Sequence, residues 1–116
     1  MNILVIDDDP SMTELLRILL EAVSSKVWTA NTGVEGIEIA KSNPIDVIIL
    51  DIMMSEMDGW QVCNAVRDFS SVPISILTAL ERPGMVAAAL DAGANDYLIK
   101  LVTSNVLISH LKKLIR

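Results

Sequence analysis

The sequence predicts an α/β fold in which helices cover both faces of a five-stranded parallel sheet. Two observations carry this prediction. Short apolar runs alternate with longer segments of helical period along the 116 residues, and most of these runs are rich in Val, Ile and Leu without polar alternation, as in strands buried on both faces. Right-handed crossovers then give five βα units in one sheet. No repeat or Pro/Gly-rich linker divides the chain, so we expect a single domain over residues 1–116.

The strands are predicted where the apolar runs are densest, because β-branched and other apolar side chains fit a covered sheet. The five predicted strands are Ile3–Ile6, Val27–Ala30, Val47–Leu50, Ile74–Leu77 and Tyr97–Ile99.

The first two helices are marked by the residues at their N-termini. Asp9 can accept the first free N–H groups of a helix that starts at Pro10, a position where a missing donor costs nothing. Thr32 and Glu35 have the spacing of a capping box for the second helix. The apolar stripe of the first helix is predicted to comprise Leu15, Leu16, Leu19, Leu20 and Val23.

The other three helices are marked at one end each. Asp58 followed by Gly59 opens the third helix, and Gly93 ends the fourth, where a left-handed residue is needed. Thr103 or Ser104 starts the last helix. The segment "MVAAALDAGA" is apolar almost all round, so we expect it either to meet a partner or to pack deeply under a neighbouring helix.

Composition excludes several classes of function. The formal net charge of -6 opposes binding of nucleic acid by this domain through bulk electrostatics. No apolar run approaches the roughly 18 residues of a membrane helix, and the start of the chain lacks the features of a secretory signal, so we expect a cytoplasmic protein. The one cysteine, Cys63, is expected to be a small packed residue.

Polar side chains follow four of the five predicted strands. The first strand ends in Asp7-Asp8-Asp9, and Asp51, Thr78 and Lys100 follow later strands. Ligands of open α/β sheets collect at this edge. Each residue alone could be an ordinary turn or solvated residue, but together they favour a site. Carboxylates held close repel unless a cation joins them, and Mg²⁺ prefers such oxygen ligands.

This set of groups suits phosphoryl transfer. Lys100 and Thr78 could hold a phosphoryl group whose charge is spread over three oxygens. Asp51 stands alone at a strand end, which favours it as the nucleophile, whereas the neighbouring Asp7 and Asp8 are suited to holding the metal.

Four motifs in order, "ILVIDDDP", "DVIILDIMMSEMDG", "ISILTA" and "GANDYLIK", give the chain a likeness over its whole length to a known family. It resembles the receiver domain of two-component response regulators, the CheY-like family. The resemblance implies a flavodoxin-like (βα)5 sandwich with strand order 2-1-3-4-5. It also implies a phosphorylation-dependent signalling switch rather than an enzyme. Such a switch catalyses only its own phosphoryl transfer and hydrolysis.

The resemblance also assigns roles to individual residues. Asp51 is similar to the residue that accepts the phosphoryl group from a sensor histidine kinase or a phosphotransfer protein. Asp7 and Asp8, with Asp51 and the backbone carbonyl of Met53, resemble the Mg²⁺ ligands. Lys100 resembles the lysine that pairs with the phosphoryl group.

Thr78 and Tyr97 are similar to the switch pair of the family, in which the hydroxyl moves toward the phosphoryl oxygens and the ring turns inward. The resemblance implies an output face made of the helix before Gly93, the strand Asp96–Ile99 and the final helix. An output domain, a partner protein or a second copy of the chain would bind this face. The domain either stands alone or is the N-terminal part of a longer regulator.

Two departures from the family pattern keep other functions open. Leu101 and Ser55 stand where proline is usual, so we expect a trans Lys100–Leu101 bond, a less firmly placed Lys100 and a less rigid loop after Asp51. A pseudo-receiver that only binds partners is one alternative. A Mg²⁺-dependent phosphohydrolase is another, although Met53 stands where that class places its acid/base carboxylate.

Overall fold

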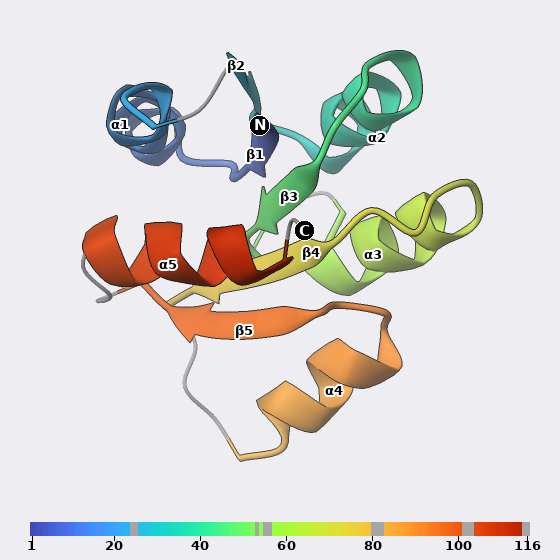
Figure 1. The fold of residues 1–116 in the computed structure, drawn as a ribbon. Helices are drawn as coiled ribbons and strands as arrows, with labels where there is room; N and C mark the ends of the chain where they lie inside the picture. Colours follow the sequence, from blue (N-terminus) through green and yellow to red (C-terminus); the bar gives the residue numbers. More distant parts are fainter. Residues whose placement is uncertain (24–25, 53, 55–56, 80–82, 101–103, 115–116) are drawn as a thin grey trace.

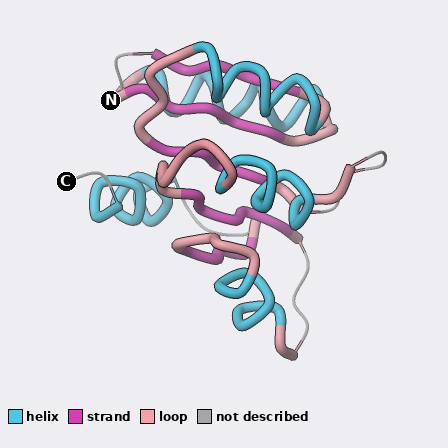
Figure 2. The backbone as a smooth tube through the Cα atoms, turned by 90° about the vertical axis from the view of Figure 1, so that its right-hand side faces the viewer, coloured by secondary structure: helices cyan, strands magenta, loops and turns pink. Residues whose placement is uncertain are grey.

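The predicted α/β sandwich is confirmed. A computed structural model describes residues 1–23, 26–52, 54, 57–79, 83–100 and 104–114. Five parallel strands form one sheet in the order β2-β1-β3-β4-β5. Helices α1 and α5 cover one face of this sheet, and α2, α3 and α4 cover the other (Figure 1). Figure 2 shows the strands lying side by side between the helices.

The elements lie close to their predicted positions. The strands are β1 (Asn2–Ile6), β2 (Lys26–Ala30), β3 (Val47–Leu50), β4 (Ile74–Thr78) and β5 (Asp96–Ile99). The helices are α1 (Pro10–Glu21), α2 (Gly33–Ser42), α3 (Gly59–Arg67), α4 (Met85–Asp91) and α5 (Ser104–Leu114). No helix of the described segments combines the length and the apolar character needed to cross a bilayer.

The alternation of side chains along the strands divides the apolar residues into two cores. In β1, for example, Ile3 and Val5 face the core under α1 and α5, whereas Leu4 and Ile6 face the core under α2 and α3. Successive side chains of a strand point to opposite faces of a sheet, so an unbroken apolar run buries both. Cys63 lies in the second of these cores, fully buried as predicted.

The predicted stripe of α1 is only partly correct. Leu16 and Leu20 are buried against the sheet, but Leu15, Leu19 and Val23 are exposed, together with Ile18. Apolar residues cover more than half of the circumference of α1, so the pattern does not decide which of them face the sheet. The buried face consists of Thr13, Leu16 and Leu20, and the other apolar side chains lie outside it.

The N-terminal caps follow the sequence with one shift. Asp9 accepts the N–H of Ser11, and Thr32 accepts the N–H of Glu35. The carboxylate of Glu35, however, accepts the N–H of Asn31 and not that of Thr32, so the reciprocal half of the predicted box lies one residue earlier. Asp58, in contrast, forms a full capping box, with Gln61 as its partner.

Helix α4 is short and exposes most of its apolar surface. Only Ala89 of this helix is buried, while Val86 and Leu90 are exposed. Gly93 has φ of 99°, as its predicted role at the helix end requires. Of the two expectations for the segment, deep packing is therefore wrong for most of α4. Thr103 lies outside the described residues, and α5 begins at Ser104.

Gly59 allows a close approach between α3 and the chain that leaves β3. An added Cβ would lie 2.5 Å from the Cα of Ile52, which is backbone and cannot turn away. We expect Gly59→Ala to lower the free energy of unfolding by about 3 kcal/mol, the upper end of overpacking effects. Urea denaturation measures this change.

Gly84 provides the comparison for Gly59. Its φ of 83° disfavours an L side chain, but an added Cβ meets nothing within 4 Å. Gly84→Ala should therefore cost only about 1 kcal/mol. Equal losses in the free energy of unfolding for Gly59→Ala and Gly84→Ala would show that the contact with Ile52 adds no cost to a side chain at residue 59.

Candidate functional site

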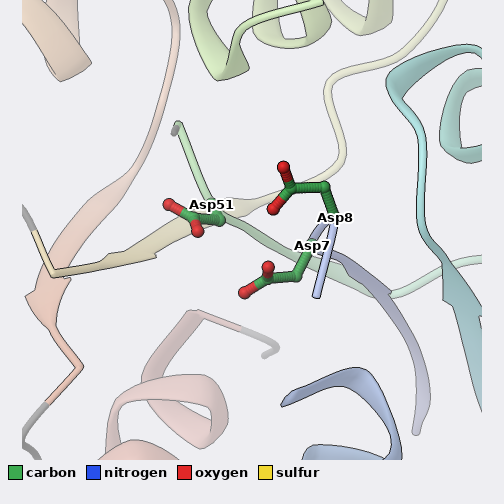
Figure 3. A group of neighbouring side chains, drawn as sticks. All are labelled: Asp7, Asp8 and Asp51. Atoms are coloured by element: carbon green, nitrogen blue, oxygen red, sulfur yellow. The ribbon is translucent and has the colours of Figure 1, made fainter. Parts of the chain in front are cut away.

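Three carboxylates gather where β1 and β3 end. Asp7 and Asp8 follow β1, and Asp51 follows β3, the neighbouring strand. One oxygen from each of the three lies within 4.8 Å of the others, and the three side chains face a common space (Figure 3). Asp7 and Asp51 are buried, while Asp8 is exposed. The fold thus brings together the acids that the sequence placed at one edge.

Lys100 lies directly against two of these acids. It follows β5, and its Nζ is 2.8 Å from Oδ2 of Asp7 and 2.9 Å from Oδ2 of Asp51. Its backbone N–H donates to the carbonyl oxygen of Thr78 at the end of β4. The ammonium therefore joins the acids of β1 and β3 from a strand two places away from β3 in the sheet.

The electrostatics of this pocket reflect its burial. Burial raises the pKa of Asp7 above its ordinary value and outweighs the lowering by Lys100 and by the N–H of Asp9, which donates to Asp7 Oδ1. Burial alone would lower the pKa of Lys100, but its contacts with Asp7 and Asp51 raise it on balance. The lysine therefore stays charged at neutral pH.

The raised pKa of Asp7 means that its ionised form is less favourable in the folded than in the unfolded chain. This cost is fully present above the raised pKa and disappears below that of an unfolded aspartate. We expect Asp7→Asn to raise Tm at neutral pH without Mg²⁺, because the amide has no charge to desolvate. Thermal unfolding followed by circular dichroism measures this change of Tm.

The same variant should lose stabilisation by Mg²⁺, because one of the three carboxylates is gone. A lower Tm for Asp7→Asn without metal would contradict the raised pKa of Asp7. An undiminished rise of Tm with added Mg²⁺ would contradict the role of Asp7 as a ligand.

The donor set suits a hard divalent cation. Three carboxylates with no histidine or cysteine favour Mg²⁺ over softer metals. The Lys100 ammonium already lies between two of the acids, so the pocket is built to hold positive charge. Met53, whose backbone carbonyl is the further ligand that the family resemblance implies, lies outside the described residues.

Thr78 and Tyr97, the predicted switch pair, lie on neighbouring strands. Thr78 is fully buried at the end of β4. Tyr97 is half-buried, packs against the core under α2 and α3, and pairs in register with Ile76. The two residues are therefore two positions apart along the β4–β5 ladder. Thr78, at the end of β4, is the one that lies at the edge of the sheet with the acids.

The two departures from the family pattern, Ser55 and Leu101, lie outside the described residues, and so does one end of the Lys100–Leu101 bond. Lys100 itself is held by two ion pairs and a backbone hydrogen bond. The contacts of its ammonium give no support to the expectation that Lys100 is less firmly placed.

Sequence reasoning did not single out Asn31, whose side chain supports this pocket. Its Nδ2 donates to the carbonyl oxygen of Asp7 and to Oγ1 of Thr13. Asn31 lies in a turn of common turn residues, "ANTG", and only the three-dimensional contact distinguishes it from its neighbours.

Curated proteins of known family resemble this chain over nearly its whole length. Response regulator MprA of Mycobacterium avium is 38% identical over 117 residues, which cover 100% of this chain and 51% of that protein. The probable transcriptional regulator ycf27 of Cyanidium caldarium is 36% identical over 99% of this chain and 46% of its own length. The chain thus spans about half the length of these curated relatives.

Solved structures give the same result. A two-component response regulator from Clostridium difficile superposes with a TM-score of 0.94 at 32% identity, covering 100% of this chain and 96% of that one. The chemotaxis protein CheY4 of Vibrio cholerae gives a TM-score of 0.89 at 29% identity over 97% of both chains. Residues 3–112 match the family described as the response regulator receiver domain. With an acidic triad typical of the Mg²⁺ site of receivers, this chain belongs to the family of response regulator receiver domains.

Proposed function

We propose that the domain is a phosphorylation-driven switch in which Asp51 accepts a phosphoryl group from a histidine kinase or phosphotransfer protein. One observation carries the proposal. A buried Asp51 is held by the Lys100 ammonium beside two further acids, at the carboxyl edge of the sheet. A pocket with this charge pattern holds both a cation and a phosphoryl group.

In the proposed reaction, a carboxylate oxygen of Asp51 attacks phosphorus as the bond from phosphorus to the donor nitrogen breaks. An acyl phosphate forms, and the donor imidazole leaves. Asp7, Asp8 and Asp51 would hold Mg²⁺, which when bound neutralises charge on the phosphoryl oxygens. Lys100 then exchanges its contact with Asp51 for a phosphoryl oxygen, and the Thr78 hydroxyl donates to another.

Intact-mass measurement after incubation with acetyl phosphate and Mg²⁺ tests this proposal. We expect a gain of one phosphoryl group that EDTA prevents and hydroxylamine removes, because hydroxylamine cleaves acyl phosphates. No gain in folded protein would favour a pseudo-receiver that acts only as an interaction module. Turnover of p-nitrophenyl phosphate would instead favour a phosphohydrolase.

Membership of the family implies a histidine kinase partner, and the exposed residues of α1 are a candidate contact for it. Leu15, Ile18 and Leu19 are 50%, 59% and 38% exposed, and together they form an apolar strip. Helix α1 begins three residues after Asp7, so a protein seated on this strip lies near the acids. Apolar side chains clustered on a surface helix are typical of a protein contact.

We expect Ile18→Lys to slow phosphotransfer from a phosphohistidine protein at least tenfold, because a charge would be buried in the contact. The rate with acetyl phosphate should not change. Rapid-quench assays with both donors measure this. Val86→Lys on α4 is the matched control, since Val86 is 58% exposed. Equal slowing with both donors would point to damage to the pocket instead.

We also propose that output passes through α4, β5 and α5, with an output domain, a partner protein or a second copy of the chain bound there. Val86 and Leu90 on α4 and Val106 on α5 are exposed apolar residues. His110 Nδ1 lies 2.7 Å from Oδ2 of Asp96, which joins α5 to β5 on this face. Tyr97 is the next residue of β5 after Asp96, so a movement of the Tyr97 ring would directly change the surface formed by α4, β5 and α5.

A further inference from the structure

The side chain of Asn31 connects three segments around the acidic pocket. Its Nδ2 is 2.9 Å from the carbonyl oxygen of Asp7 and 3.1 Å from Oγ1 of Thr13. Both hydrogens of the amide nitrogen are therefore used. The backbone N–H of Asn31 donates to Oε1 of Glu35 at 3.0 Å, which fixes Asn31 at the start of α2.

Thr13 gives this contact a rigid base. It is 3% exposed, and its own hydroxyl donates to the carbonyl oxygen of Pro10 in the first turn of α1. The Asn31 amide thus joins the end of β1 to the beginning of α1. Asp8 lies on the short connection between these two elements, whose two ends the Asn31 amide contacts.

The backbone at Asp7 is restrained from several directions. Its N–H donates to the carbonyl oxygen of Ala30 at 3.1 Å, and its carbonyl accepts from Asn31, the next residue. Its carboxylate accepts the N–H of Asp9. Both backbone polar groups of Asp7 are thus hydrogen-bonded to the segment that follows β2.

We propose that Asn31 is a positioning residue for the metal pocket, which holds the Asp7–Asp8 backbone so that both carboxylates stay directed at Asp51. The inference rests on the proposed Mg²⁺ site. Neighbouring carboxylates repel one another, and a free turn would let them move apart. A backbone fixed in advance removes the cost of bringing them together when the cation binds.

The contact pattern separates this role from a general contribution to stability. Without the Asn31 amide, the Thr13 hydroxyl still donates its hydrogen bond to the carbonyl oxygen of Pro10, so the first turn of α1 persists. The loss falls on the carbonyl of Asp7, a residue of the pocket. The effect should therefore appear as weaker Mg²⁺ binding by protein that is still folded.

Isothermal titration calorimetry with MgCl2 tests the inference. We expect the Kd for Mg²⁺ to rise about tenfold in Asn31→Ala, a typical effect of losing a group that supports metal ligands. Asn43→Ala is the matched control. This variant also loses a hydrogen bond from a side-chain amide to a backbone carbonyl, that of Ile39, but at the far end of α2. Its Kd should equal that of the parent.

A kinetic readout gives a second test. With acetyl phosphate as donor, Asn31→Ala should need about ten times more Mg²⁺ for half-maximal phosphorylation, while the maximal rate stays the same. Asn31→Leu, which has the same number and branching of side-chain heavy atoms as Asn but no donor, should behave likewise and serves if the alanine variant unfolds. Thr13→Ser, which keeps the hydroxyl that the amide contacts, should retain the parent Kd.

The outcomes distinguish the inference from the proposed function. Parent-like Mg²⁺ affinity in folded Asn31→Ala and Asn31→Leu overturns the positioning role and leaves the metal site intact. A parent protein that binds no Mg²⁺ overturns the proposed site and the inference with it. Weaker binding in Asn43→Ala as well would mean that loss of stability causes the effect, which also overturns the positioning role.

Discussion

An Asp51→Asn variant is expected to gain no phosphoryl group from acetyl phosphate under conditions that fully label the parent chain. The amide lacks the anionic oxygen that attacks phosphorus, although it occupies the same space at the end of β3. Intact-mass measurement over a time course gives the result. Because the change removes the nucleophile itself, the expected loss is complete.

Asp46→Asn is the matched control, because Asp46 immediately precedes the same strand that Asp51 follows. Its Oδ2 accepts the N–H of Asn2 at 2.7 Å, and an amide oxygen can do the same. We expect parent-like phosphorylation. Full labelling of Asp51→Asn would mean that another side chain accepts the phosphoryl group, with Asp7 and Asp8 as the first candidates.

Most of the fold could be predicted because one physical signal repeats along the chain. Apolar runs such as Val47–Leu50 are buried on both faces of the sheet, and unbroken apolar runs are typical of this arrangement. The caps of α1 and α3 were also readable, since Asp9 and Asp58 act within their own few residues. The exposed half of α1 was not. Burial of Leu16 in preference to Leu15 depends on how the helix lies on the sheet.

The site was readable to a similar extent. Strand ends locate Asp7, Asp51 and Lys100 at one edge, because parallel strands all end on the same side. The sequence did not reveal that the ammonium contacts two acids rather than one. Asn31 was missed because a turn residue acquires its role from a carbonyl 24 positions away. Such backbone contacts leave no pattern in a single sequence.

Lys100→Met is expected to change two properties of the pocket in opposite directions. The affinity for Mg²⁺ should increase about tenfold, equivalent to roughly 1.4 kcal/mol. The rate of phosphorylation at saturating Mg²⁺ should fall by about 100-fold, in the range found when one group that stabilises transition-state charge is removed. Methionine keeps most of the apolar stem of lysine, so the packing around it changes little.

The first effect follows from the position of the ammonium. Lys100 Nζ contacts oxygens of Asp7 and Asp51, two of the three carboxylates that would hold the metal. A cation entering this space meets a like charge and must displace it from Asp7. The second effect follows from the reaction itself, because the transferring phosphoryl group would lose its nearest fixed positive charge.

Calorimetry with MgCl2 and a time course of intact mass measure the two properties, and Lys113→Met on the exposed surface of α5 is the control. A general loss of structure would weaken both metal binding and phosphorylation, so tighter binding with slower transfer is a result that unfolding cannot imitate. Weaker Mg²⁺ binding in folded Lys100→Met would mean that the lysine helps to assemble the acids before the metal arrives. The ammonium would then prepare the metal site rather than compete for it.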